Sequence, residues 1–335
     1  MSKKQDFDAL FRGDVQDRTL FRPIFMHFAA RYIGATYGQF ASDYRTLVRA
    51  NIECMHAFHT DMVGLISDPY RETSAFGARI TFLDEAVPKC ENILIRSKED
   101  IKTLSNPDVY KAERTRDRIR GAELFQKELN GGVPVIGWIE GPLAEACDLA
   151  GVSEILMQLM MDPDFVCMLM DKCLVTAKEF AKAQIEAGCD VIGIGDAICS
   201  QIDKVTYDQF VQERHQDLVR FIRDQGARVK LHICGDITHL LASIKAVAPD
   251  ICDLDWQVNP DQAFDILGPD MVRCGNINPV IIQNTSPETL FVQARQLVKK
   301  EQNRKFILSG GCEITVNTPH EHVSALSNAC TSGIQ

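Results

Sequence analysis

Eight short apolar segments, separated by amphipathic stretches, constrain the fold of this chain more than any other feature. The segments are continuous in their apolar character, which is typical of parallel strands covered on both faces by helices. Strands and helices that alternate in this way predict either a closed (β/α)8 barrel or an open, doubly wound sheet. The eight segments are residues 22–30, 61–69, 133–142, 190–197, 229–236, 250–256, 271–279 and 305–313.

Three of the intervening stretches predict helices with defined ends. Residues 152–188 are rich in strong helix formers, and their apolar residues recur every three or four positions up to a stop at Gly188. Residues 206–226 show the same pattern and end at Gly226. Residues 286–303 open with Ser286, which predicts an N-cap.

The loop after the first segment distinguishes the two architectures. A doubly wound nucleotide-binding sheet normally carries G-x-G-x-x-G at this point. The chain instead reads "RPIFMHFAARYIG", and the pattern G-x-x-x-x-G-K-[ST] occurs nowhere in its 335 residues. We therefore predict an α/β protein with one (β/α)8 TIM barrel domain over residues 1–335. The first 20 or so residues of this domain are expected to form an N-terminal helical extension.

Composition bounds the location and the partners of the protein. The net charge is −10, and the 36 Lys and Arg residues are scattered, which argues against a nucleic-acid partner. The N-terminus is charged, and no apolar run reaches the roughly 18 residues of a membrane span. The 12 cysteines stand singly in apolar segments, as expected for reduced thiols in the cytoplasm. We expect a cytoplasmic protein without a membrane partner, compatible with a homodimer.

Polar residues follow nearly every predicted strand, and the active site of a barrel lies at these C-terminal ends. Among them, Asp68, Glu72 and Asp196 are the candidate catalytic groups. For Asp68 and Glu72 the alternative is a loop carboxylate paired with Arg71, and for Trp256 it is a place in the core. The candidate substrate-binding residues are Arg31, Arg71, Glu140, Trp256 and Asn276.

The stretch "KLHICGD" places a histidine and a cysteine one residue apart at the end of the fifth segment. Side chains of a strand alternate between its faces, so His232 and Cys234 point the same way. Cys312 follows Gly310 and Gly311 at the end of the eighth segment. Two thiolates and one imidazole form a known catalytic zinc set that leaves a fourth position open. The alternative is a buried cysteine beside a hydrogen-bonded histidine.

Three other histidines are weaker candidates for metal ligands. His239 falls in the helix expected after the fifth strand, and we expect it to face solvent or a loop. His320 and His322 fall in the first turn of the last predicted helix, where neighbouring side chains diverge.

Six stretches together resemble the uroporphyrinogen decarboxylase superfamily, and they are spread over nearly the whole chain. The resemblance implies a (β/α)8 barrel with a deep cleft. The stretches are "FMHFAARY" (25–32), "SDPY" (67–70), "GPLAEA" (141–146), "LDW" (254–256), "GNINP" (275–279) and "GGCEITVNTPHEHV" (310–323).

The sequence departs from the decarboxylases of that superfamily at several positions. They carry two arginines in the first-strand motif, where this chain has His27 and Arg31. They carry a tyrosine after the third strand, where this chain has "AEACDLAG", and a histidine on the last strand, where it has Cys312. The carboxylate at Asp68 is retained.

The chain is more similar to the corrinoid-dependent methyltransferase branch, which includes methylcobalamin:coenzyme M methyltransferase. That branch carries H-x-C followed by a distant cysteine on the last strand, and these residues bind zinc. Here "HIC" (232–234) and Cys312 match in type, order and spacing, and "DPYRETSAFGA" (68–78) also resembles the branch. The resemblance implies zinc, a corrinoid such as methylcobalamin carried by a partner protein, and a small methyl donor or acceptor.

Three hypotheses follow. The first is a zinc methyltransferase that works with a corrinoid protein, in either direction of transfer. The second is a uroporphyrinogen decarboxylase, which would need no metal. The third is a non-enzymatic barrel that binds a corrinoid or zinc.

Overall fold

Eight parallel strands form one curved sheet in the computed structural model, which describes residues 2–14 and 17–331. The strands are β1 (Leu20–Phe21), β2 (Val63–Gly64), β5 (Val135–Glu140), β6 (Val191–Gly195), β7 (Arg228–His232), β8 (Ile251–Asp253), β9 (Val272–Ile277) and β10 (Phe306–Gly310). Their order in the sheet is β1-β10-β9-β8-β7-β6-β5-β2, so each strand from β5 onward pairs with its neighbours in the chain. The predicted (β/α)8 barrel is confirmed.

Asp61 joins the two strands that end this order. Its backbone N–H donates to the Phe21 carbonyl at 2.8 Å, and its carboxylate accepts from the Phe21 N–H at 2.7 Å. Arg18 donates to both oxygens of the same buried carboxylate, at 2.6 and 2.8 Å. Asp61 therefore closes the barrel between β1 and β2.

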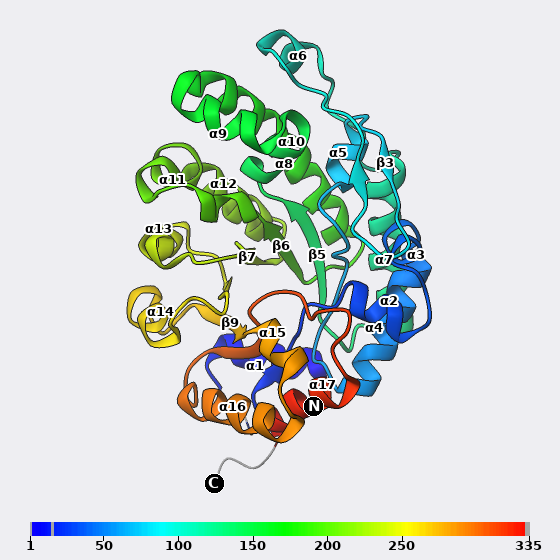
Figure 1. Cartoon of the computed structure of the whole chain (residues 1–335), viewed down its shortest axis with the longest axis vertical. Helices are drawn as coiled ribbons and strands as arrows, with labels where there is room; N and C mark the ends of the chain where they lie inside the picture. The colour runs from blue at the N-terminus through cyan, green and yellow to red at the C-terminus, as the bar shows by residue number, and fades with distance from the viewer. Residues whose placement is uncertain (1, 15–16, 332–335) are drawn as a thin grey trace.

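Helices surround the sheet in sequence order, from blue to red around the ring (Figure 1). Among the described residues they are α1 (Lys3–Arg12), α2 (His27–Tyr32), α3 (Tyr37–Ser42), α4 (Tyr44–Phe58), α5 (Arg71–Ala75), α6 (Lys98–Thr103), α7 (Glu113–Leu129), α8 (Pro142–Ala150), α9 (Val152–Met161), α10 (Pro163–Glu186), α11 (Lys204–Phe210), α12 (Gln212–Asp224), α13 (Leu241–Val247), α14 (Pro260–Leu267), α15 (Pro279–Asn284), α16 (Pro287–Lys300) and α17 (His320–Thr331), with short 3₁₀ turns η1 (Ala197–Gln201) and η2 (Thr238–Leu240). Within the described residues, no helix has the length and apolar character needed to cross a membrane.

The first helix covers the N-terminal end of the barrel. Lys4 donates from its backbone to Gly132 before β5, and Asp8 pairs with Arg228 at the start of β7. Phe7 and Leu10 of α1 join the apolar side chains inside the barrel. The opposite, C-terminal end of the strands is left for the loops that carry chemistry.

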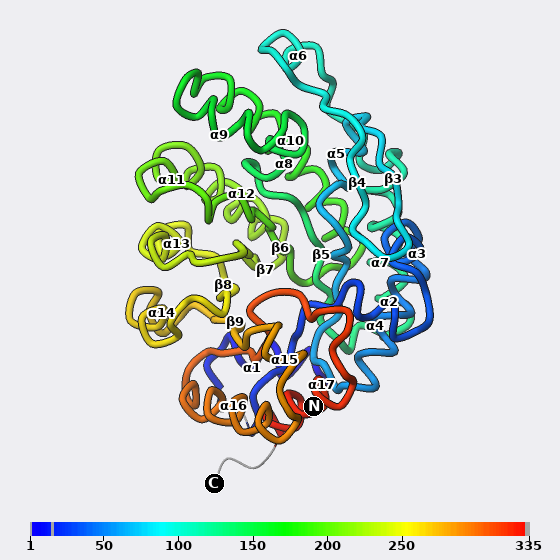
Figure 2. The backbone as a smooth tube through the Cα atoms, in the orientation of Figure 1, coloured from blue at the N-terminus to red at the C-terminus, as the bar shows by residue number. Residues whose placement is uncertain are grey.

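A long connection runs from β2 to α7 over that C-terminal end. It includes α5, the antiparallel hairpin of β3 (Ile80–Thr81) and β4 (Lys89–Cys90), and α6. Figure 2 traces it in cyan along one edge of the molecule, with α6 at its tip. This connection carries Asp68, Arg71 and Glu72.

Three boundaries differ from the sequence-based expectations. The segment 22–30 was expected to be a strand, but β1 lies just before it and residues from His27 onward form α2. Phe28, Ala29 and Ala30 are buried in this helix, and periodicity does not separate a buried helix from a buried strand. The helices expected over 152–188 and 206–226 are each divided in two, the first at Asp162 before a proline.

The expected helix ends and N-cap are confirmed. Gly188 and Gly226 follow α10 and α12 with φ values of 104° and 91°, which favour glycine. The Ser286 side chain accepts from the Thr289 N–H at the start of α16.

Trp138 fills the barrel interior because β6 offers it two glycines. A Cβ on Gly193 would lie 2.3 Å from Cε3 of Trp138, and one on Gly195 would lie 2.9 Å from Nε1. The indole then packs beside His232, with 5.8 Å between ring centroids.

We predict that Gly193→Ala lowers the free energy of unfolding by about 1–3 kcal/mol, because the added methyl overpacks the interior. Urea denaturation measures the change. In a Trp138→Phe background the same substitution should cost less, since the clashing atom is gone. An equal cost in both backgrounds would contradict this account of the interior.

Candidate metal centre

Three sequence-predicted ligands converge at the C-terminal mouth of the barrel. Nε2 of His232 lies 2.9 Å from Sγ of Cys234, and the two sulfur atoms of Cys234 and Cys312 lie 3.4 Å apart. All three ligand atoms lie within 4.8 Å of one another. His232 is buried, whereas both cysteines are partly exposed, so the sulfur side of the group faces the mouth.

The strands place these residues by alternation and by a close approach of two loops. Lys230 and His232 point into the barrel, while Val229 and Leu231 join the outer core. Beyond β10, Gly311 abuts the β8 loop so tightly that a Cβ would lie 2.3 Å from the Trp256 nitrogen. A glycine at this position lets Cys312 approach the end of β7.

Asp253 orients the histidine from below. Its Oδ2 lies 2.8 Å from Nδ1 of His232, which leaves Nε2 directed at the sulfur atoms. Burial lowers the pKa of His232, but the hydrogen bond to Asp253 and the contact with Cys312 outweigh it and raise the pKa to about 9. The Cys234 hydrogen bond lowers the pKa of Cys312 to about 4, burial opposes this, and His232 adds to it.

The donor set fits zinc. Two sulfurs and one imidazole nitrogen are the ligands of known catalytic zinc sites, in which substrate or water takes the fourth position. The hydrogen bond between the two thiols lowers the pKa of Cys312 and raises that of Cys234, and both would have to be thiolates to bind a metal. A second group of Asp196, Cys199 and His215 is also close enough to hold an ion.

Hydrogen bonds within the protein account for that second group. Asp196 is fully buried, and accepts from the Ala144 N–H at 2.8 Å and the Leu143 N–H at 3.3 Å, at the start of α8. Its Oδ2 also lies 3.0 Å from Nε2 of His215, whose Nδ1 lies 2.8 Å from the Tyr207 hydroxyl. Asp196 thus lies on the helical side of the sheet, away from the barrel interior, and its catalytic role stays a prediction.

Asp68 is held by Arg114, a residue that the sequence did not single out. The guanidinium donates to Oδ1 at 2.7 Å and to Oδ2 at 2.6 Å, and the Ser67 hydroxyl donates to Oδ2 at 2.6 Å. Burial raises the pKa of Asp68, but Arg114 outweighs it, and the pKa lies well below its usual range. Asp68 is an ionised, paired carboxylate.

Arg71 and Glu140 are brought together at the ends of β2 and β5. Nη2 of Arg71 donates to Oε1 of Glu140 at 2.6 Å, and Nη1 donates to the Asp68 carbonyl. Glu72 lies 3.6 Å from the Arg71 Nε and accepts from the Glu140 N–H at 2.9 Å. The alternative considered for Glu72, a carboxylate beside Arg71, is therefore present, whereas Asp68 pairs with a different arginine, and the catalytic roles of both stay predictions.

Burial raises the pKa of the carboxyl groups beside Arg71. The pKa is raised well above its usual value for Glu140, for Asp148 and for Glu145, which accepts from the Thr73 hydroxyl at 3.2 Å. Glu145 and Asp148 lie on α8 within "GPLAEA" and "AEACDLAG", which bore on the family resemblance only, so neither was selected for the site.

The remaining predicted residues lie around the mouth. Arg31 is exposed and donates to Asn317 at 2.8 Å, in a separate surface pocket that both residues line. Trp256 is 47% exposed, so it is not a core residue. The Asn276 amide donates to the Asp255 and Val258 carbonyls at 3.1 and 2.8 Å, and so fixes the loop that carries Trp256.

Glu313 is a further residue of the mouth that sequence reasoning did not select for the site. Its Oε1 accepts from the His27 N–H at 3.0 Å. Burial raises the pKa of Glu313 to about 7. The hydrogen bond from His27 lowers this pKa, and the charge of Cys312 raises it further.

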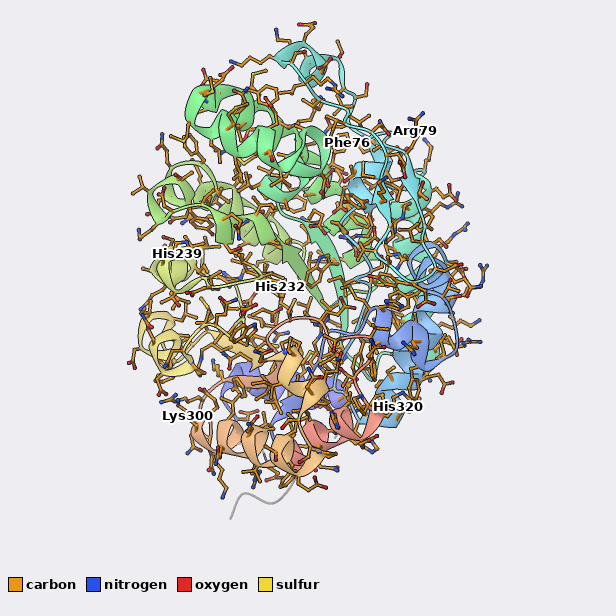
Figure 3. The ribbon with its side chains drawn as sticks, viewed as in Figure 1. Phe76, Arg79, His232, His239, Lys300 and His320 are labelled. Atoms are coloured by element: carbon orange, nitrogen blue, oxygen red, sulfur yellow. The ribbon has the colours of Figure 1, made fainter. Side chains whose placement is uncertain are left out.

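His239 and His320 lie away from His232, as Figure 3 shows. His239 lies in η2 and its Nε2 is 2.9 Å from the Ile202 carbonyl, in agreement with the expected loop contact. His320 packs against Phe28, Tyr32 and Phe58, and His322 contacts the Ile282 carbonyl.

We predict that Arg114→Met lowers the free energy of unfolding by about 3–5 kcal/mol at pH 7, because it leaves Asp68 buried and unpaired. The difference from wild type should shrink as the pH falls below about 4, since protonation removes the charge that Arg114 neutralises. Urea denaturation at several pH values measures both. Arg116→Met, an exposed change on the same helix, is the control, and equal losses in the two variants would contradict the pairing.

The chain is similar in sequence to two groups of named proteins and similar in fold to a solved structure. The chain is 26% identical over 251 residues to a uroporphyrinogen decarboxylase of Geobacter metallireducens, covering 73% of this chain and 72% of that one. It is 27% identical over 227 residues to the methylcobamide:CoM methyltransferase MtaA of Methanosarcina barkeri, covering 65% and 64%. A solved methyltransferase from Methanosarcina mazei has the same fold, with a TM-score of 0.89, 18% identity and 98% of each chain covered.

The sequence pattern of the uroporphyrinogen decarboxylase (URO-D) family matches residues 2–332, which includes every strand of the barrel and all three candidate metal ligands. This chain therefore belongs to the uroporphyrinogen decarboxylase family.

Proposed function

We propose that this protein is a zinc-dependent methyltransferase of that family. It would move a methyl group between a corrinoid and a small substrate, such as a thiol or a methylated donor. The corrinoid, methylcobalamin or a related form, would be carried by a partner protein. The protein would act in the cytoplasm as a single barrel domain over residues 1–335.

One observation carries the proposal. His232 and Cys234 lie at the end of β7 and Cys312 lies just after β10, and their ligand atoms lie within 4.8 Å of one another at the mouth. Ordinary packing of a buried cysteine beside a histidine does not require a third ligand from β10. The similarity to a methylcobamide:CoM methyltransferase supports the same assignment.

Zinc held by these three residues would stabilise the thiolate form of a bound thiol near neutral pH. The two cysteine thiolates offset the charge of the ion, so the substrate sulfur keeps its nucleophilic character. The imidazole, fixed by Asp253, completes the set from inside the barrel. The partly exposed sulfur side leaves room for substrate from the mouth.

The surrounding residues would bind and orient the two substrates. Trp256 presents an exposed ring beside the loop of Cys312, where it can contact a substrate or the partner. Asn276 holds that loop, and Arg71 and Glu140, paired at the ends of β2 and β5, would bind substrate from there. Arg31 would contact a substrate or the partner from the neighbouring surface pocket beside α2. Asp68, Glu72 and Asp196 would take part in catalysis indirectly. Asp68 and Glu72 would position the connection after β2, and Asp196 would position the start of α8.

Two alternative functions are distinguished from this proposal by experiment. Several curated relatives are named uroporphyrinogen decarboxylase, at 26–30% identity, and a decarboxylase would need no zinc. A barrel that only stores zinc or a corrinoid would bind its ligand without turnover. A homodimer is compatible with each of the three.

We predict about one zinc per chain in protein purified without chelator, and methyl transfer from methylcobalamin to at least one of a panel of small thiols. Elemental analysis measures the first, and the cobalt absorption spectrum follows the second. Less than about a tenth of an equivalent of zinc with turnover intact would contradict the metal assignment. Decarboxylation of uroporphyrinogen by the metal-free protein would favour the first alternative.

We also predict that Cys234→Ala and Cys312→Ala stay folded but lose methyl transfer by more than about 100-fold, beyond the loss typical of changes outside the ligand set. The barrel buries its own core, so the metal is not needed to close it. Circular dichroism and melting check the fold beside turnover. Cys173→Ala, a buried change on α10, is the control. Full activity in both ligand variants would remove zinc from the mechanism.

A further inference from the structure

Three charged side chains lie inside the barrel, in a layer directly beneath His232. Arg22 is 3% exposed, Lys230 is 1% exposed and Asp253 is 5% exposed. The interior positions closer to the N-terminal end are apolar, and include Leu20, Met62, Ile136, Val191, Ile251, Val272 and Ile307. The three charges lie at the level of the barrel that supports the candidate metal centre.

Asp253 joins this layer to the metal centre through both of its oxygens. Oδ1 accepts from the Lys230 ammonium, and Oδ2 lies 2.8 Å from Nδ1 of His232. The register explains the arrangement, because Lys230 pairs with Ile251 across β7 and β8. Two residues further along each strand, His232 and Asp253 face the interior side by side.

Stability alone does not account for this layer. Removing two ions from water is costly, and apolar side chains of similar volume are often neutral or stabilising in place of a buried ion pair. One nitrogen of Arg22, Nη1, is buried without a hydrogen-bond partner, so the layer is not even fully satisfied. Buried charges that do not add to stability indicate another role, and the residue that they contact is His232.

The chemistry of the three groups assigns that role. Lys230 is a donor only, so the Asp253 oxygen that faces it must accept. An ionised Asp253 is an acceptor at its other oxygen too, so when His232 gives up a proton to become a metal ligand, the proton that it keeps lies on Nδ1. Nε2 then keeps its lone pair, on the side of Cys234 and Cys312.

We propose that Asp253, held by Lys230, is a positioning residue that fixes the ring and the tautomer of His232 for metal binding through Nε2. This inference rests on the proposed zinc site. Lys230 gives it a specific consequence. In Asp253→Asn, the amide oxygen must turn to Lys230, so the amide N–H₂ faces His232. Nδ1 must then accept, and the proton moves to Nε2, where it blocks the metal.

The test compares zinc affinity in wild type, in Asp253→Asn and in Glu301→Gln. Glu301 forms another buried ion pair, at 2.8 Å to Arg273, remote from the three ligands. We expect Asp253→Asn to raise the zinc dissociation constant by about 10–100-fold, measured by competition with a chelator. The Co²⁺-substituted protein should lose its sulfur-to-cobalt absorption at limiting metal. Glu301→Gln should lose stability and keep wild-type affinity.

A second measurement uses the wild-type protein and so does not depend on the folding of a variant. Nuclear magnetic resonance of the zinc-loaded, ¹⁵N-histidine-labelled chain should show His232 protonated at Nδ1 and bound through Nε2. A metal-bound or unprotonated Nδ1 would overturn the inference. Unchanged zinc affinity in folded Asp253→Asn would overturn it while leaving the proposed function intact, whereas a wild-type protein that binds no zinc would overturn both.

Discussion

The parallel register of β7 to β10 is the constraint on which the candidate metal centre depends. Each strand pairs with the next in the chain, so the ends of all four strands lie at one mouth of the barrel. The curvature of the sheet then carries the end of β10 across to the end of β7. Two sulfur atoms that lie 78 residues apart in the sequence come to 3.4 Å. Asp61 preserves the curvature by joining the first strand to the second.

The two halves of the barrel interior differ in composition, the N-terminal half being apolar and the half near the mouth containing charged residues. The N-terminal half is apolar and covered by Phe7 and Leu10 of α1. The half below the mouth contains Lys230 and Asp253, which weaken the apolar core but orient His232. The same division appears on the rim, where buried pairs such as Asp68–Arg114 fix the loops that surround the site. Other buried ion pairs, such as Arg273–Glu301, lie away from the mouth, so it is the contact of Asp253 with His232 that ties this layer to the candidate ligands.

Much of this arrangement was predictable from the sequence, because it follows from the alternation of side chains along a strand and from the order of the strands in the chain. Strand alternation placed His232 and Cys234 on one face, and the number of strands placed Cys312 at the same mouth. The partners of these residues were not predictable. Asp253 comes from another strand, Arg114 comes from a helix 46 residues after its carboxylate, and neither carries a motif. The first strand was misplaced because buried helix α2 is as apolar as a strand.

The central claim is that His232, Cys234 and Cys312 bind one zinc ion and leave a position for substrate. X-ray absorption at the zinc edge tests it most directly on the purified protein. The account predicts two sulfur ligands at about 2.3 Å and one imidazole nitrogen at about 2.0 Å, with a third sulfur when a thiol substrate is added. A shell of oxygen and nitrogen alone, or a sulfur count that does not change with the thiol, would contradict it.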